Sequence, residues 1–138
     1  AIPQGSIIQS ATLQVYRDDT SFPFNNTDTT SVNLIQTTQA NTSNLVGSDY
    51  SKIAFVGGGA VNFSATSNNT YFTITLNATA LGWIIAGGIS KLGLLTGLDL
   101  NNLTPSGINE LGMQSGTGIN KPILTVNYLP PSGIIGDI

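Results

Sequence analysis

The stretch SATLQVYR, residues 10–17, places apolar and polar side chains in alternation. Its apolar set is Ala11, Leu13 and Val15, and the residues between them are mostly polar. A period of two is that of a β-strand with one side buried and the other facing solvent. The stretch therefore predicts a half-buried strand close to the start of the sequence.

The same alternation returns along the rest of the chain. It is clearest in NTYFTITLN (69–77), and it recurs in PILTVNYL (122–129), where Leu124, Val126 and Tyr128 share one side. About eight short strands, separated by clusters of Asn, Ser, Gly and Pro, favour an all-β fold, namely an antiparallel β-sandwich of jelly-roll type. The further strands that we expect cover 31–38, 52–57, 60–65, 91–98 and 109–116, with Gly57–Gly59 joining the second and third of these as a hairpin.

One segment breaks this rhythm and predicts a short helix near 79–86. Apolar residues recur at helical spacing within LNATALGWIIAGG (76–88). Asn77 or Thr79 can cap the first turn of this helix with a side-chain oxygen. Trp83 is expected to pack in the core beside it.

The length of 138 residues fits a single domain, and the composition does not shift along the chain. We expect the domain to cover 1–129 and residues 130–138 to form a C-terminal tail or linker, because Pro130 and Pro131 cannot continue a strand ladder. Two interpretations of the tail stay open. It is either a frayed end or linker, or a segment that adds a strand to the sheet edge of a neighbouring subunit. In the second case the contacting residues are Ile134, Ile135 and Ile138.

Charged residues make up only 8% of the chain, whereas an average soluble domain has about 25%. Four Lys and Arg residues are too few for a basic patch, so neither nucleic-acid binding nor docking on anionic lipid is expected. The longest apolar run, at 81–89, is about half a membrane span, so no membrane insertion is expected. A surface of Thr, Asn, Ser and Gln with weak net charge gives little protection against self-association.

The chain lacks the side chains that most often carry catalysis. It contains no Cys and no His, which excludes disulfides, thiolate metal sites and the commonest general base. Among its seven carboxylates only Asp18 and Asp19 are adjacent, and neighbours on a strand point to opposite faces. We therefore expect no enzymatic activity and no cofactor.

The loop RDDTSFPFNNTD (17–28) offers weak candidates for two kinds of site. Its carboxylates Asp18, Asp19 and Asp28 are hard oxygen ligands that suit a structural calcium ion, but the loop lacks EF-hand spacing and the same residues are equally good turn formers. Phe22 and Phe24 surround a Pro in the same loop. They predict a contact with a neighbouring chain or, alternatively, an exposed platform for carbohydrate.

Three segments combine into a recognisable framework: IPQGSIIQSATLQVYRDD (2–19), GWIIAGGISKLGLLTGLDLNN (82–102) and KPILTVNY (121–128). They hold an Ile-Pro-x-Gly opening before the first strand, a Trp-bearing turn followed by a Leu-Gly-Leu strand and an Asp, and a closing Pro-x-Leu-x-Val-x-Tyr strand. In these features the chain resembles the disaggregatase-related, DNRLRE-type jelly-roll domains. The residues that fall on the family's first-strand pattern are Ile2, Pro3, Gly5, Ile8, Ser10, Ala11, Leu13 and Tyr16.

The resemblance implies a β-sandwich like that of carbohydrate-binding modules, used as a non-catalytic part of secreted, cell-surface and phage structural proteins. It implies no functional residue. The Arg and Glu of the strand after which the family is named are missing, because LGMQSGTGIN (111–120) occupies that region. Residues 20–70 match no family pattern.

Composition and resemblance together predict a non-enzymatic structural module on the exterior of a cell or virion. We expect it to bind copies of itself or a scaffold such as a capsid, fibre or surface layer, as a virion decoration or fibre protein or a surface filament subunit does. The expected location is extracellular, at the cell surface or at the virion surface. The alternative is a carbohydrate-binding module of an adhesin or secreted enzyme.

Overall fold

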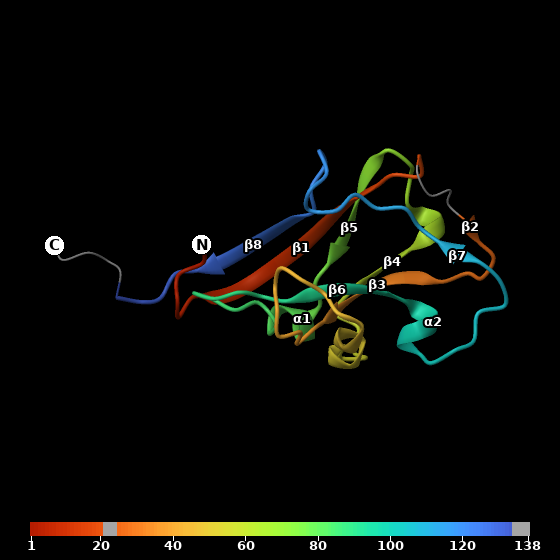
Figure 1. Cartoon of the computed structure of the whole chain (residues 1–138). Helices are drawn as coiled ribbons and strands as arrows, with labels where there is room; N and C mark the ends of the chain where they lie inside the picture. Colours follow the sequence, from red (N-terminus) through yellow and green to blue (C-terminus); the bar gives the residue numbers. More distant parts are fainter. Residues whose placement is uncertain (21–24, 134–138) are drawn as a thin grey trace.

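Two three-stranded antiparallel sheets form the framework of the protein (Figure 1). The computed structural model describes residues 1–20 and 25–133. The first sheet has the order β5 (Thr70–Thr75), β1 (Ile7–Arg17), β8 (Ile123–Leu129). The second sheet has the order β4 (Ala60–Asn62), β3 (Ser31–Gln36), β6 (Leu92–Thr96). The all-β prediction is thereby confirmed.

Short elements complete the fold and cover few residues. A two-stranded ladder joins β2 (Asn25–Asn26) to β7 (Asn109–Glu110). The helical pieces are α1 (Ala78–Leu81), α2 (Gly97–Leu100) and the 3-10 helices η1 (Gly47–Lys52) and η2 (Phe63–Ala65). No helix in the described ranges is long and apolar enough to cross a membrane.

The alternation along β1 fixes which side of the first sheet is buried. Leu13 pairs with Ile74 of β5 on one side and with Leu124 of β8 on the other. Residues paired across antiparallel strands share a face, so the apolar residues at these paired positions point the same way. The opposite face is mostly polar, and Tyr16 and Tyr71 pack there edge to face with ring centroids 5.2 Å apart.

One hydrophobic core joins the inner faces of both sheets. Leu34 of β3 and Ile74 of β5 have no exposed surface, and Trp83 is 8% exposed, as expected from the sequence. Burying each large apolar side chain contributes about 1.5–3 kcal/mol. The buried cluster consists of Ala11, Val15, Val32, Leu34, Phe63, Phe72, Ile74, Leu76, Ala80, Trp83 and Ile84.

The predicted helix near 79–86 exists but is shorter. Asn77 caps α1 as expected, because its side-chain oxygen accepts a hydrogen bond from the Ala80 N–H at 3.0 Å. After Gly82 the chain continues in tighter turns, with the Trp83 N–H bonded to the Ala80 carbonyl at 3.0 Å. These turns place Trp83 and Ile84 in the core, where a regular helix would separate them around its axis.

The hairpin predicted around Gly57–Gly59 is wrong. Residues 52–57 form no strand beyond a single bridge between Ile53 and Thr37, and β4 pairs with β3 instead. The glycines allow this segment to lie close to its neighbours in the core. The Gly58 N–H donates to the Leu34 carbonyl at 2.7 Å. Gly59 has a φ of +142°, and a Cβ there would lie 2.2 Å from the Thr75 carbonyl oxygen.

Two other predicted strands are shortened at glycines. The strand expected at 91–98 runs over Leu92–Thr96 and then turns into α2 at Gly97. The strand expected at 109–116 is reduced to β7 and a single bridge between Met113 and Arg17. Gly112 separates the two pieces, and its carbonyl accepts a hydrogen bond from the Asp18 N–H at 3.0 Å.

Adding one methyl group at Gly58 tests the close packing of this segment. A Cβ at Gly58 would lie 2.2 Å from Cζ3 of Trp83 and 2.6 Å from Cβ of Ala80, and neither of these buried groups has room to move. We expect Gly58→Ala to lower the free energy of unfolding by about 1–3 kcal/mol in urea denaturation. Gly116→Ala is the matched control because nothing lies within 4 Å of its added Cβ. Equal stability of the two variants would contradict this packing.

Candidate interaction groove

The free edge of β6 is the first part of the candidate site. In the described part of the chain β6 pairs only with β3. Leu34 of β3 donates its N–H to Gly59 at 2.8 Å and accepts at its carbonyl from Gly58, so its backbone groups point away from β6. Antiparallel alternation then turns the backbone groups of Leu94, opposite Leu34, toward the unpaired side.

The same alternation applies to both ends of β6. Leu92 and Leu94 direct N–H and C=O groups to the free edge, and Thr96 directs its N–H there. The Thr96 carbonyl belongs to the first turn of α2, for which Thr96 is the N-cap. The edge therefore offers backbone donors and acceptors over a span of five residues.

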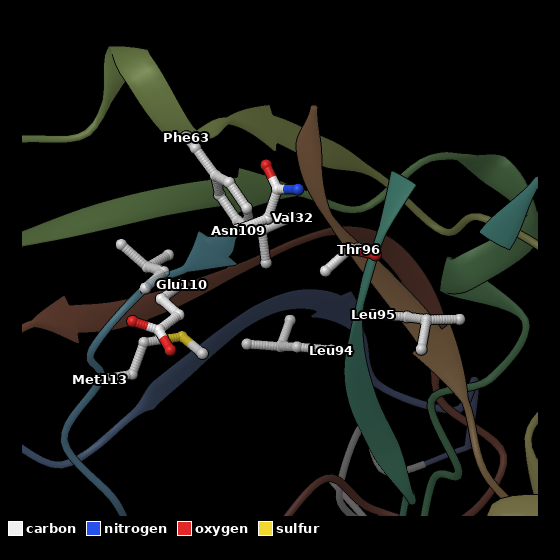
Figure 2. A pocket seen from close by; sticks show the side chains of 9 residues that line it. Val32, Phe63, Leu94, Leu95, Thr96, Asn109, Glu110 and Met113 are labelled. Carbon is white, nitrogen blue, oxygen red and sulfur yellow. The ribbon is translucent and has the colours of Figure 1, made fainter. Parts of the chain in front are cut away.

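Two apolar cavities lie beside this edge, and Leu94 and Met113 line both of them. Each has a volume of about 340 Å³. Figure 2 shows the cavity at the Thr96 end, where Leu94 from β6 lies across from Met113 and buried Val32 and Phe63 also line the space. We call these two cavities together with the free edge of β6 the edge groove.

The cavity at the other end of β6 reaches the first sheet. Its walls include Leu13 and Val15 of β1, Leu92 of β6 and Pro122, which precedes β8. Leu124 of β8 is on the inner face of the first sheet, yet it is 39% exposed. The inner face of β8 is therefore not fully covered by the second sheet.

Hydrogen bonds, rather than close packing, hold the wall of the edge groove that lies opposite β6, at residues 112–114. Gln114 donates its backbone N–H to the Tyr16 carbonyl at 3.0 Å and its side-chain Nε2 to Asp18 Oδ2 at 2.8 Å. The Thr20 hydroxyl and Gln114 both donate to Asp18 and lower the pKa of its carboxyl group. These bonds tie residues 112–114 to the end of β1, away from β6.

The buried cation of Arg17 fixes the same wall of the groove, next to Met113. Arg17 is only 6% exposed and sits opposite Met113 in the isolated bridge. Its guanidinium contacts both carboxylate oxygens of Asp19, with Nη2 to Oδ2 at 2.6 Å, and donates to the Thr66 carbonyl at 2.6 Å and hydroxyl at 2.9 Å. Because the charge is paired and hydrogen-bonded, its burial is tolerated.

The strand β7 at the Thr96 end is anchored through Asp28. The Asp28 carboxylate accepts hydrogen bonds from the Ser106 hydroxyl, the Ser106 N–H at 2.9 Å and the Asn109 Nδ2 at 2.8 Å. The Ser106 hydroxyl makes the largest contribution and Asn109 the next, and both lower the pKa of the Asp28 carboxyl group. Asp28 therefore positions the segment from which Asn109 and Glu110 line the groove.

The three calcium candidates are each held by protein donors in separate places. Asp18 bonds to Gln114, Asp19 pairs with Arg17, and Asp28 bonds to Ser106 and Asn109. Over residues 1–20 and 25–133 no group of three His, Cys, Asp or Glu side chains could hold a metal ion. The calcium site stays a prediction.

The predicted contact residues lie outside the described residues. Phe22 and Phe24 belong to 21–24, and Ile134, Ile135 and Ile138 belong to 134–138. The alternation in the sequence does not reveal the edge groove, because its walls come from six separate segments. The local signal is the pair Gly112 and Gly116 within the strand predicted at 109–116.

A second surface with aromatic side chains was also missed. Tyr50 is 60% exposed and Phe55 is 51% exposed, and their rings meet edge to face with centroids 6.3 Å apart. They line a hollow of about 610 Å³ together with Asp99 and Asn102. The sequence pattern places Phe55 on the strand predicted at 52–57 and Tyr50 before it, so it predicts different surroundings for the two rings.

No protein-family model, no curated protein and no solved structure matches this chain. The resemblance to DNRLRE-type domains therefore rests on the sequence segments alone.

Acidification tests the role of Asp28. Its pKa is lower in the folded protein than the ordinary value of 3.8, so the ionised form stabilises the fold. That stability is present above about pH 4 and is lost as the pH falls through the folded-state pKa. We expect Asp28→Asn to be less stable than the unaltered protein at pH 7 and to lose less further stability on acidification. Urea midpoints from neutral pH to about pH 2 measure this, and parallel losses in the two proteins would contradict it.

Proposed function

We propose that the chain is a non-enzymatic structural module that assembles with copies of itself on the exterior of a cell or virion. The observation that carries the proposal is the edge groove, in which an unpaired strand edge runs beside two apolar cavities. An unpaired edge is a template for adding a strand from another chain. A virion decoration or fibre protein and a surface filament subunit are the classes that fit this behaviour.

The unpaired edge of β8 supports the same proposal. In the described ranges β8 pairs only with β1, and its sequence ILTVNYL carries no charge and no proline. Soluble proteins commonly protect such edges with Lys, Pro, a bulge or a covering loop. The absence of charge and proline along β8 favours a protein whose edges are covered on assembly.

The exposed apolar side chains also support the proposed assembly. Ile119 is 96% exposed, Leu45 is 74% exposed and Ile7 is 64% exposed, in a chain of which only 8% is charged. Scattered apolar residues are normal on a surface, but here few charges separate them. Contacts between copies would remove this surface from water.

The finer fold type and the location form part of the proposal. A jelly-roll arrangement of the two sheets agrees with the DNRLRE-type resemblance of residues 2–19, 82–102 and 121–128. The Thr- and Asn-rich surface supports an extracellular location. So does the occurrence of that family in secreted, cell-surface and phage structural proteins. Neither the fold type nor the location depends on a catalytic residue.

Self-association is the direct test of this function. We expect the purified chain to form ordered multimers whose size in analytical ultracentrifugation grows with concentration, and electron microscopy to show regular fibres or shells. Because the contacts are apolar and backbone-mediated, we expect high salt to leave them intact, unlike screened ion pairs. A chain that stays monomeric at every concentration, with or without salt, would rule the proposal out.

Carbohydrate binding is a second candidate, and the exposed aromatic pair favours it. Tyr50 and Phe55 form a platform with Asp99 and Asn102 beside it, and an aromatic face with neighbouring hydrogen-bonding groups suits a sugar ring. We expect a glycan array to retain the protein and Tyr50→Ala to abolish that retention. Ile119→Ala, at a 96% exposed position that does not line this hollow, is the control. Retention by both variants alike would exclude this surface.

A further inference from the structure

The edge groove has the length of a short extended segment. β6 comprises Leu92–Thr96, and its outward backbone groups lie at Leu92, Leu94 and Thr96. One cavity is lined by Leu92 at the start of the strand and the other by Thr96 at its end. Their wall residues are four steps apart along β6, which is about 13 Å at the rise of a strand.

The last five residues of the sequence match this spacing. They read IIGDI at 134–138 and lie outside the described residues. In an extended segment Ile134, Gly136 and Ile138 share one side, and Ile135 and Asp137 share the other. Only the first side can face the groove, because burying the Asp137 carboxylate without a partner is costly.

We propose that residues 134–138 of a second copy of this chain bind in the edge groove as an antiparallel strand along β6. This inference rests on the proposed assembly function and names its contact. Ile138 then pairs with Leu92, Gly136 with Leu94, and Ile134 with Thr96. The two isoleucines enter the two cavities, and the glycine leaves room for Leu94 between them.

A single molecule cannot make this contact with its own segment. β8 ends at Leu129, which pairs with Ile7, whereas Met113 in the walls of both cavities bridges to Arg17. Ile7 and Arg17 are ten residues apart on β1, about 33 Å at the rise of a strand. The five steps from Leu129 to Ile134 span at most about 18 Å.

The donated segment and the edge groove are different surfaces, so the proposed contact joins each molecule to a neighbour. Figure 1 shows β8 running away from the β2 and β7 end of the protein, so β8 finishes toward one end and the cavity at Thr96 lies toward the other. A contact between two different surfaces of identical molecules is heterologous and repeats without closing unless the rotation forms a ring. Filaments or closed rings are the expected assemblies, and a two-fold dimer in which both segments are exchanged is the smallest such ring.

Cysteine trapping tests the register directly, because the chain has no cysteine. Leu95 and Ile135 fall opposite each other on the outer side of the proposed pair, and Figure 2 shows the Leu95 side chain pointing away from Leu94. Such a pair brings Cα atoms to about 4.5 Å, which suits a disulfide. We expect a mixture of Leu95→Cys and Ile135→Cys proteins to form a disulfide-linked dimer under mild oxidation.

The matched control replaces the donor position by Thr125→Cys, on the outer face of β8. It should give no linked dimer with Leu95→Cys above the background of random collision. Equal yields from the two mixtures would overturn the proposed contact.

Serine variants separate this inference from the proposed function. We expect Ile134→Ser with Ile138→Ser to abolish multimers in ultracentrifugation, and Ile135→Ser alone to keep them, because its side chain faces outward. A synthetic peptide of residues 130–138 should dissociate the multimers of the unaltered protein. If the unaltered protein assembles and the double variant does too, this contact is wrong while assembly stands. If the unaltered protein never assembles, the proposed function itself fails.

Discussion

Backbone pairing on both sides of β1 is the interaction on which the rest of the structure depends. β1 has eleven residues and pairs with β5 along one side and β8 along the other. Its alternation therefore decides the inner face for all three strands at once, since partners across a ladder point the same way. A slip of one residue would turn every inward side chain outward. The second sheet and α1 pack on the face that this register exposes.

The two sides of the molecule differ in how completely they are closed. On one side β4 and β5 contact each other and are joined by the turn of η2, with Phe63 buried beneath it. On the other side β6 and β8 have unpaired edges in the described structure. There the segment 112–114 bonds to β1 and not to β6. Part of the core is thus lined by strand edges and cavities, and the assembly proposed above would cover them.

Much of the fold could be predicted because alternation is a local property. Strands β1, β5 and β8, the cap at Asn77 and the burial of Trp83 all follow from side chains within a few residues of one another. The mistaken hairpin shows the limit: Gly58 is a glycine because Trp83 packs against it, a contact between distant residues. The edge groove could not be predicted for the same reason, since its existence depends on which strands become edges. Nor does alternation bring Tyr50 and Phe55 together.

The burial of Arg17 has a consequence for resistance to proteolysis. Trypsin-like proteases cut after Lys or Arg in accessible, extended backbone, and this protein has only four such residues. Arg17 is inside a paired strand with its side chain enclosed. Lys121 is followed by Pro122, a bond that these enzymes cleave poorly, and Lys91 is half-buried beside Gln39. Exposed Lys52 is then the one basic residue left as a ready point of cleavage, so a surface with few basic residues also makes the folded protein resistant to proteases of this class.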